Sequence, residues 1–436
     1  MKKRIYLPIE IQNREFDVRL DLAAKMLAKD WEVILGRFND VVNLAHELGG
    51  GVLFYKAHSD SVIEKKLMPA KKAGTRLVCL DEEGLIFPSS QWYLRHRIGT
   101  GEFLDQIDAI FTWGPLQHNI LASTFPQIST KLHMTGNARI HPSPRSKDRK
   151  RDVILINTNF GPANLSKTIR ETYIEMVEKQ RTETGLEDRR FLESRQEYYG
   201  ALIEHYVAFI RDLATQNSQR GKPFKIVLRP HPIEDMLFWE DAMFDLDVKV
   251  ETKRPTTAFF PSCHCMIHTG CTTAIEGFMA GVPVLRYNPI YPQNNTQESI
   301  IPNAISQDIT NASQVFDISP KERDVAESLS DYIYFGEDSP SNIQADIIDN
   351  LDVTMGKPVP NMGSVDAFSD HLDVLQSKYI ATYPQMAKRF LESKTFAKRR
   401  AQLHRWPLLA KRDLKSRSPR PVTVKKVKPQ VFLLQN

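Results

Sequence analysis

The chain has 436 residues, of which 41% are hydrophobic and 25% charged, and its formal net charge is +5. This length exceeds the usual size of one hydrophobic core, so we expect two domains. No stretch approaches the ~20 consecutive apolar residues that a membrane-spanning helix needs, which argues against an integral membrane protein. The basic start, Met1-Lys2-Lys3-Arg4, precedes only a short apolar run, which predicts a first strand rather than an export signal.

Residues 1–140 are predicted to form one domain in which strands and helices alternate. The predicted strands cover residues 4–11, 31–36, 52–57, 76–80, 108–113 and 131–135, and the predicted helices cover residues 13–29, 39–48, 59–72 and 115–125. This alternation predicts a parallel, doubly wound sheet of the α/β class. The domain has no G-x-G-x-x-G fingerprint, so the sequence does not indicate an NAD site.

Three carboxylates, Asp81, Glu82 and Glu83, follow the fourth predicted strand, at a carboxyl end where α/β proteins place their sites. Neighbouring carboxylates raise one another's pKa, which suits general acid or base catalysis. A solvated loop is the alternative interpretation. A second charged group lies just after the first strand and could line the same cleft or form an exposed helix face: Arg14, Glu15 and Arg19.

Residues 141–151 are rich in proline and basic residues, as in a linker, and residues 152–351 are predicted to form a second α/β domain. It begins with a strand over residues 152–157 and contains helices over residues 165–181 and 188–217. Further strands end near Arg229, at residue 251, at His268 and at Tyr287. Residues 290–316 are predicted to be a loop, and helices at residues 331–335 and 343–351 are predicted to close this domain.

The four cysteines are placed in predicted strands or a turn, which favours a reducing cytoplasm over a disulfide framework. They are Cys79, Cys263, Cys265 and Cys271. With His264 and His268, the last three would permit a zinc site, but the paired C-x2-C spacing of structural zinc sites is missing. A buried strand that holds small apolar thiols is the favoured interpretation, and no metal ligand is assigned.

The most informative stretch is residues 224–289. Arg229 and His231 lie at the carboxyl end of its first predicted strand. The strand must end at Pro230, because proline has no N–H group to donate to a neighbouring strand. A later strand ends at His268, and a helix is predicted to start near Thr272. Free N–H groups at such a helix start favour an anion, and threonine hydroxyls add donors. The convergence of these groups predicts a phosphate or pyrophosphate site.

Each of these residues also has an ordinary structural interpretation. Thr273 and Glu276 fit a capping box, T-x-x-E, which needs no ligand. His231 could be a core histidine, and Arg229 could pair with Glu234 at the surface. The combination at the strand ends favours a site over these separate explanations.

The Arg-Pro-His-Pro strand end and the Thr-Thr helix start resemble the surface carbohydrate biosynthesis family. Its relatives include capsule Kdo transferases, bacterial polysialyltransferases and CDP-glycerol glycerophosphotransferases. The resemblance covers about residues 1–350. It implies that His231, Thr272 and Thr273 hold the donor phosphate beside Arg229 and Gly270, and that Glu276 binds the donor ribose. It also matches Asp81-Glu82-Glu83-Gly84, the charged cluster with Arg14, Glu15 and Arg19, and the Asn-Thr-Asn-Phe turn that contains Asn157 and Asn159, which would face the cleft.

This resemblance implies a GT-B-like glycosyltransferase, with two Rossmann-like domains facing a cleft. The donor would be a CMP-activated Kdo or sialic-acid-like sugar, and the acceptor a surface polysaccharide or lipid-linked glycan. A carboxylate among residues 81–83, with Glu83 favoured, would be base or nucleophile, and no metal or cofactor is expected. The alternatives are a CDP-glycerol or CDP-ribitol polyol-phosphate transferase, a nucleotide-sugar hydrolase or epimerase, and an inactive scaffold of a capsule assembly complex.

The C-terminal part of the chain is predicted to be a helical extension over residues 352–393 and a basic, flexible tail over residues 394–436. Residues 388–428 contain fifteen Lys and Arg against two acids, a net charge of +13, so the remainder carries 5 − 13 = −8. Basic residues beside Trp406 suit an anionic membrane surface, although they also suit nucleic acid. We favour the membrane and expect a cytoplasmic protein, peripheral on the inner face of the cytoplasmic membrane.

Overall fold

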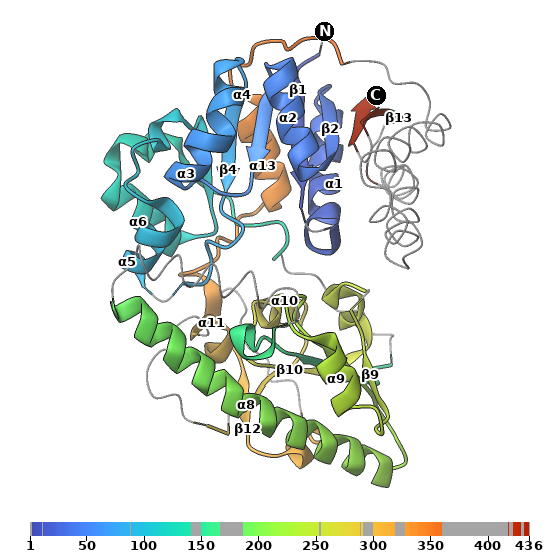
Figure 1. Cartoon of the computed structure of the whole chain (residues 1–436). Helices are drawn as coiled ribbons and strands as arrows, with labels where there is room; N and C mark the ends of the chain where they lie inside the picture. Colours follow the sequence, from blue (N-terminus) through green and yellow to red (C-terminus); the bar gives the residue numbers. More distant parts are fainter. Residues whose placement is uncertain are drawn as a thin grey trace, which may run out of the picture. The chain divides into compact units, whose positions relative to one another are not determined.

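The computed structural model describes residues 2–10, 12–87, 89–140, 150–165, 186–252, 254–287, 289–290, 300–318, 328–359, 417, 422–428 and 431–435, without the side chains of residues 12–14, 162, 186–195, 300, 426 and 428. The chain forms two compact units, each with its own sheet (Figure 1). Unit 1 comprises Met1–Leu85, Gln91–Arg139 and Asp331–Asn436, and unit 2 comprises Ile86–Ser90 and Ile140–Ser330.

Unit 1 is built on six parallel strands in the order β2-β1-β3-β4-β5-β6. They are β1 (Arg4–Ile9), β2 (Glu32–Arg37), β3 (Val52–Tyr55), β4 (Arg76–Leu80), β5 (Ala109–Thr112) and β6 (Leu132–Met134). The strands are short apolar runs because a parallel sheet is covered on both faces. The chain moves from β1 to β2 and then returns past β1 to β3, so the switch point of this sheet lies between β1 and β3.

Helices cover both faces of this sheet. Crossovers that run in opposite directions place α1 and α2 on opposite faces, because such connections are right-handed. α1 packs beside α13, and α2 packs beside α4. The helices are α1 (Gln12–Ala28), α2 (Phe38–Leu48), α3 (Asp60–Val62), α4 (Met68–Lys72), α5 (Ser90–Tyr93), α6 (Pro115–Thr124) and α13 (Pro340–Asp349), with π-helical turns at Ile63–Leu67 and Leu94–Ile98.

The prediction that residues 331–351 close the second domain is wrong. Lys29, directly after α1, forms an ion pair with Asp346 of α13 at 2.7 Å, and Gln344 Nε2 donates to Thr135 Oγ1 at 3.1 Å, so α13 belongs to unit 1. Residues 331–335 form turns rather than a helix. An amphipathic pattern marks a helix, but it does not say which sheet the apolar side meets.

The prediction of a flexible tail over residues 394–436 is also wrong for the end of the chain. Residues Thr423–Lys428 (β13) and Val431–Gln435 (β14) form an antiparallel hairpin, and β14 pairs antiparallel with β2. The four side chains from Val431 to Leu434 are buried. The hairpin therefore covers the β2 edge, which would otherwise present unpaired backbone groups.

Residues 352–359 follow α13 as an extended segment along unit 1, where a helical extension was predicted to begin. Gly51 N donates to Thr354 O at 2.8 Å, and Lys357 N donates to Leu48 O at 2.8 Å. Gly50 permits this close approach, since a Cβ atom there would lie 2.3 Å from Gly356 N and its φ is +59°. The predicted helix over residues 165–181 and the rest of the predicted extension lie outside the described residues.

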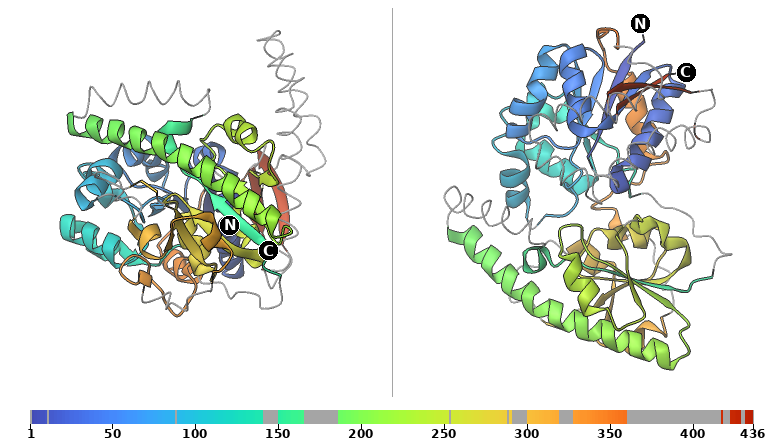
Figure 2. Two further views of the ribbon diagram at one scale, coloured as in Figure 1. Left: turned by 90° about the horizontal axis from the view of Figure 1, so that it is seen from below. Right: turned by 45° about the vertical axis from the view of Figure 1, so that its right-hand side comes forward.

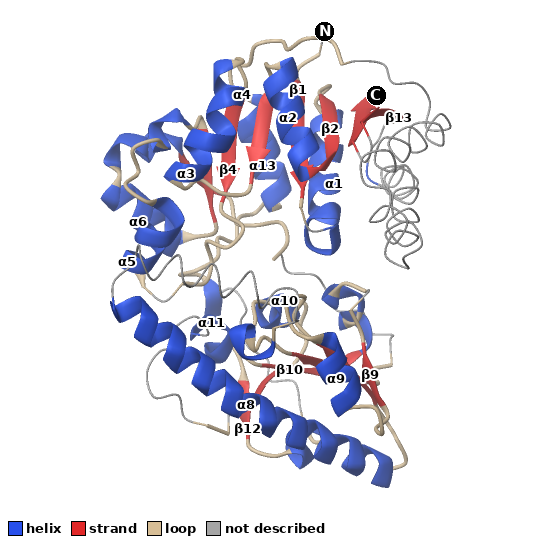
Figure 3. Cartoon of the chain, in the orientation of Figure 1, coloured by secondary structure: helices blue, strands red, loops and turns tan. Residues whose placement is uncertain are grey.

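Unit 2 has six parallel strands in the order β12-β11-β10-β7-β8-β9, which is the Rossmann order. They are β7 (Val153–Asn157), β8 (Lys225–Arg229), β9 (Val248–Val250), β10 (Cys263–His268), β11 (Val284–Tyr287) and β12 (Gln307–Ile309). Its helices are α8 (Leu186–Gln219), α9 (Met236–Ala242), α10 (Thr273–Met279) and α11 (Ile300–Ala304). The predicted α/β class, with a doubly wound parallel sheet in each half, is confirmed (Figure 3).

The long helix α8 lies across one face of this sheet (Figure 2) and packs its buried Tyr206 and Ile210 against the strands. Residues 300–316, predicted to be a loop, instead contain α11 and the edge strand β12. β12 has three residues and one buried side chain, Ile309, so no apolar run marked it. In the described part of the chain, no helix is both long and apolar enough to cross a membrane.

Candidate functional site

The switch point of unit 2 lies between β7 and β10, and polar residues end the strands on both sides of it. Asn157 at the end of β7 pairs in register with Arg229 on β8 and with His268 on β10. Residues in register on parallel strands point to the same face of the sheet. Three polar side chains therefore form one row at the carboxyl edge, where ligands of open α/β sheets bind.

The loops beyond these strands are joined by hydrogen bonds across the switch point. Asn157 Nδ2 donates to Thr273 Oγ1 at 2.9 Å, and Asn159 N donates to Thr269 Oγ1 at 2.7 Å. The turn after β7 and the start of α10 are thereby held together. Asn159, predicted from the sequence, contributes its backbone to this contact, and Asn157 begins the same Asn-Thr-Asn-Phe turn that the sequence indicated, whereas Thr269 was not predicted as a site residue.

The predicted capping box at the start of α10 is not formed. Thr273 is the first helical residue, and the capping position belongs to Thr272, whose side chain makes no capping bond. Thr272, Thr273 and Glu276 are all partly exposed. Gly270 makes the preceding turn at φ +86°, a conformation that favours glycine. The side chain of Thr273 therefore accepts a hydrogen bond from Asn157 and does not cap the helix.

Arg229 does not pair with Glu234, contrary to the surface ion pair considered from the sequence. Its guanidinium donates to Thr256 Oγ1 and, at 2.7 Å, to Arg254 O. Burial lowers the pKa of Arg229, while the negative charges of Glu251 and Glu276 oppose this effect. The guanidinium is thus a half-buried cation that the loop after β9 holds in place.

Glu234 is a buried carboxylate that organises the two turns beside this row. Its carboxylate accepts from Thr158 Oγ1 at 3.0 Å, Phe160 N at 3.2 Å, His231 N at 3.2 Å and Trp239 Nε1 at 2.8 Å. Burial raises the pKa of Glu234, and these hydrogen bonds oppose the rise. His231 itself is partly exposed rather than a core histidine. Glu234 therefore fixes the backbone from which His231 projects.

His268 is fully buried and its tautomer follows from its partners. Gly270 N donates to His268 Nδ1 at 2.9 Å, so Nε2 carries the proton and donates to Ser306 Oγ at 2.7 Å. Burial, and secondarily the charge of Arg286, lowers the pKa of His268 to about 3. The neutral ring thus fixes the Thr269-Gly270 turn at the site.

We expect stability to depend on pH through His268. The pKa of His268 in the folded state lies below the unfolded value of 6.5. The contribution of the neutral ring to the free energy of unfolding is therefore complete above pH 6.5 and is lost as the pH falls towards 3. Within this range the free energy of unfolding falls by about 1.4 kcal/mol per pH unit. In urea unfolding between pH 7.5 and 4.5, His268→Asn should show a shallower pH dependence, since asparagine can still accept from Gly270 N but does not titrate. His264→Gln, on the same strand but partly exposed, is the control, and equal slopes for wild type and His268→Asn would contradict this account.

The cysteine and histidine residues considered for zinc do not converge. Cys263 lies in the core on one face of the sheet, with Val153 and Met266, whereas Cys265 lies in the core on the other face, with Ile267. Among the described residues, no group of three or more His, Cys, Asp or Glu side chains is arranged to hold a metal ion.

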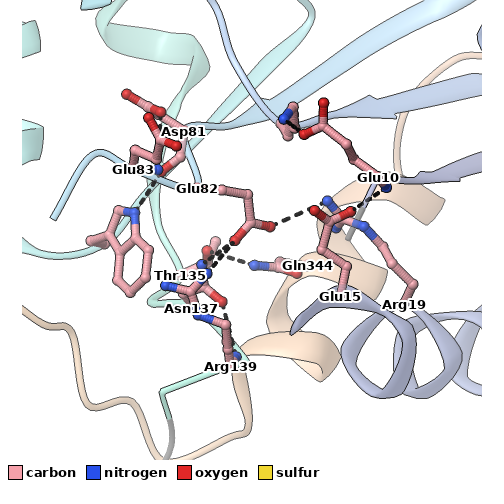
Figure 4. Close-up of polar contacts among 12 residues, drawn as sticks. Glu10, Glu15, Arg19, Asp81, Glu82, Glu83, Thr135, Asn137, Arg139 and Gln344 are labelled. Atoms are coloured by element: carbon pink, nitrogen blue, oxygen red, sulfur yellow. Dashed lines mark hydrogen bonds and ion pairs between the residues drawn. The ribbon is translucent and has the colours of Figure 1, made fainter. Parts of the chain in front are cut away.

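In unit 1, Glu82 is the centre of a polar cluster at the carboxyl edge of the sheet (Figure 4). It forms an ion pair with Arg19 of α1 at 3.2 Å, accepts from Asn137 Nδ2 at 3.0 Å and lies 3.8 Å from Arg139. Arg19 is almost fully buried over the Phe54 ring, and burial lowers its pKa. These contacts make Glu82 a structural carboxylate.

The two neighbouring carboxylates differ in exposure. Asp81 is buried and forms an ion pair with Arg97, whose Nε lies 3.1 Å from Asp81 Oδ2, and Arg97 NH1 also lies 2.8 Å from Glu83. Glu83 has 72% of its side chain exposed. Of the three predicted carboxylates, Glu83 is therefore the most accessible to an incoming group. Arg97, in a π-helical turn that no apolar pattern marks, was missed.

The remaining predicted residues of unit 1 are only partly joined to this cluster. Glu15 is buried and accepts from Glu10 N at 2.8 Å, while Glu10 forms an ion pair with Lys56 at the switch point between β1 and β3. Figure 4 shows Glu15 and Arg19 together on α1, near Glu82. The side chain of Arg14 lies outside the described residues.

No protein-family model matches the chain, and no curated protein matches it. Among solved structures, the chain is similar to UDP-GlcNAc 2-epimerase from Methanocaldococcus jannaschii, with 10% identity over 80% of this chain and 99% of that one, at a TM-score of 0.46. It is also similar to the wall teichoic acid polymerase TagF, with 9% identity over 68% of this chain and 72% of that one, at a TM-score of 0.40.

A third similarity is to the accessory secretory protein 1, 2 and 3 structure from Streptococcus pneumoniae. It has 9% identity and a TM-score of 0.35, and the chain spans about half (53%) of that chain's length. Since all three TM-scores are below 0.5, the assignment of the fold rests on the strand order of this chain itself.

Proposed function

We propose that the protein is a glycosyltransferase that binds the nucleotide of an activated sugar at the switch point of unit 2. The observation that carries the proposal is the row of Arg229, Asn157 and His268, followed by the threonine hydroxyls at the start of α10. Rossmann-type sheets bind nucleotides at this position. The resemblance of the Arg-Pro-His-Pro and Thr-Thr motifs to CMP- and CDP-dependent transferases supports the same assignment.

In this proposal the residues of unit 2 act on the leaving nucleotide. Negative charge on its phosphate grows as the bond to the sugar breaks, so fixed donors stabilise the transition state more than the bound substrate. Arg229, His231, Thr272 and Thr273 would supply these donors. Glu83 of unit 1 would serve as base or nucleophile towards the sugar or its acceptor.

The proposed donor is a CMP-activated Kdo or sialic-acid-like sugar, and the proposed acceptor is a surface polysaccharide or lipid-linked glycan. The basic residues of the segment 388–428 would hold the protein at an anionic membrane, where such acceptors are assembled. No metal ion or cofactor is assigned a role in this scheme.

The nucleotide that raises the melting temperature tests the donor class, because a ligand that binds only the folded state stabilises it. We expect CMP to protect, by about 2.7 kcal/mol at a concentration of 100 times its Kd. Protection by CDP-glycerol or CDP-ribitol in place of CMP-sugars would favour polyol-phosphate transfer, and protection by UDP would redirect the donor. The absence of protection by every nucleotide would refute the enzyme and favour a scaffold.

His231→Ala and Thr272→Ala are each expected to weaken CMP binding about 10-fold to 100-fold while the fold survives. Each change removes a contact to a charged phosphate, which contributes ~1.5–3 kcal/mol. Both side chains are partly exposed, and neither belongs to the buried core. Titration calorimetry measures the affinity, with His205→Ala on the exposed side of α8 as the control. Unchanged affinity in both variants would remove these residues from the donor site.

A further inference from the structure

Two buried polar atoms at the switch point of unit 2 have no hydrogen-bond partner among the described residues. They are Asn157 Oδ1 and Arg229 Nε. Asn157 is only 3% exposed, and the two residues are neighbours in register on β7 and β8. Both side chains therefore start from adjacent positions on the same face of the sheet.

The two atoms have complementary hydrogen-bonding properties. The Nδ2 group of Asn157 already donates to Thr273, which leaves its Oδ1 as an acceptor, whereas Arg229 Nε can only donate. Buried polar groups without partners are rare, since they lose water and gain nothing in exchange. A group that donates to Asn157 and accepts from Arg229 would satisfy both, and a hydroxyl is the smallest organic group with this property.

We propose that Asn157 and Arg229 form a subsite for a ribose hydroxyl of the bound nucleotide. This inference rests on the proposed nucleotide site and gives Asn157 a specific role that the sequence did not assign. Asn157 is one hydrogen bond, 2.9 Å, from Thr273, a proposed phosphate ligand. In a nucleoside monophosphate the ribose is bonded directly to the phosphate, so its hydroxyls lie within reach of a subsite beside the phosphate. The hydroxyl donates to Asn157 Oδ1 and accepts from Arg229 Nε.

The wild-type protein tests the subsite without any mutation. Binding of CMP, UMP, AMP and GMP is compared with that of their 2′,3′-dideoxy counterparts by titration calorimetry. We expect removal of the hydroxyls to weaken binding of the preferred nucleotide about tenfold or more, as for other hydrogen bonds to charged groups. Equal binding of the two forms would overturn the subsite and leave the nucleotide site intact. Failure of every nucleotide to bind would overturn both proposals.

The variant Asn157→Ala then assigns the effect to this residue. In this variant we expect the ribonucleotide and its dideoxy form to bind with nearly equal affinity, because the hydroxyl has lost its acceptor. Asn217→Ala is the matched control, since Asn217 is equally buried but bonds to Phe224 at the opposite, amino-terminal edge of β8. It should retain the wild-type ratio.

Two results would contradict the assignment to Asn157. One is full discrimination between the two nucleotide forms in Asn157→Ala. The other is an equal loss of affinity for both forms in this variant, accompanied by unchanged binding of the phosphate-free nucleoside, which would place Asn157 on the phosphate instead. If Asn157→Ala does not fold, the comparison in the wild-type protein still decides whether a hydroxyl subsite exists.

Discussion

Replacing Glu83 with glutamine is expected to lower the rate of sugar transfer by about 10²–10⁴-fold, the usual contribution of a general acid or base. Nucleotide affinity should not change, because the variant damages only the chemical step. Glu83 is the exposed member of its group, while Asp81 is buried against Arg97 and Glu82 is held by Arg19 and Asn137. The rate is measured as release of nucleotide from the activated sugar in the presence of an extracted glycan.

Two matched variants separate catalysis from structure. Glu102→Gln changes an exposed carboxylate of unit 1 outside the cluster and should keep the full rate. Glu82→Gln should lower the melting temperature, since it leaves the buried guanidinium of Arg19 without its ion-pair partner. A Glu83→Gln protein that turns over at the wild-type rate would show that the base lies elsewhere.

Glu234→Gln is expected to lower the free energy of unfolding by about 1–3 kcal/mol, the cost of leaving a buried donor without its acceptor. The carboxylate accepts from four donors, three of them N–H groups, whereas a glutamine amide offers one acceptor oxygen and turns an NH2 group towards the remaining donors. The turns after β7 and β8 would both lose their anchor. Nucleotide affinity should fall with stability, because His231 is bonded to Glu234 through its backbone.

Urea unfolding of wild type and variant measures this loss. Glu240→Gln, on the exposed side of α9, is the control and should stay within about 0.5 kcal/mol of wild type. A loss of less than about 1 kcal/mol in Glu234→Gln would mean that the four donors find other acceptors, and that Glu234 does not organise the site.

The alternation of strands and helices could be predicted because buried parallel strands are short apolar runs. The strand β4 (Arg76–Leu80) was predicted at its exact bounds, and β1 and β7 within two residues. Short edge elements could not be predicted in the same way. β12 pairs on one side only and needs few apolar residues, and β14 is apolar but follows a long basic segment, so it was predicted to be part of a tail.

Arg229 and His231 of the candidate site could be predicted, because they directly follow an apolar strand in the sequence. Residues that act through contacts across the sheet could not be predicted. Glu234 was considered only as an alternative surface partner of Arg229, but its role depends on a turn more than 70 residues earlier, Thr158 to Phe160. Asn157 was predicted only as part of the Asn-Thr-Asn-Phe turn, because its bond to Thr273 depends on the sheet order. Strand order is a long-range property that local pattern does not encode.

The hairpin β13–β14 changes how the basic residues before it are to be understood. Residues 352–359 and the hairpin are both anchored on unit 1, so the chain between them leaves and returns to the same body. In the sequence, most of the basic residues of the segment 388–428 therefore stand between two parts of the chain that belong to unit 1. Truncation after Phe390 would remove β14 together with the basic residues and uncover the β2 edge. An internal exchange of Lys and Arg for Gln within residues 388–416, with the hairpin retained, separates the loop's charge from the sheet's integrity.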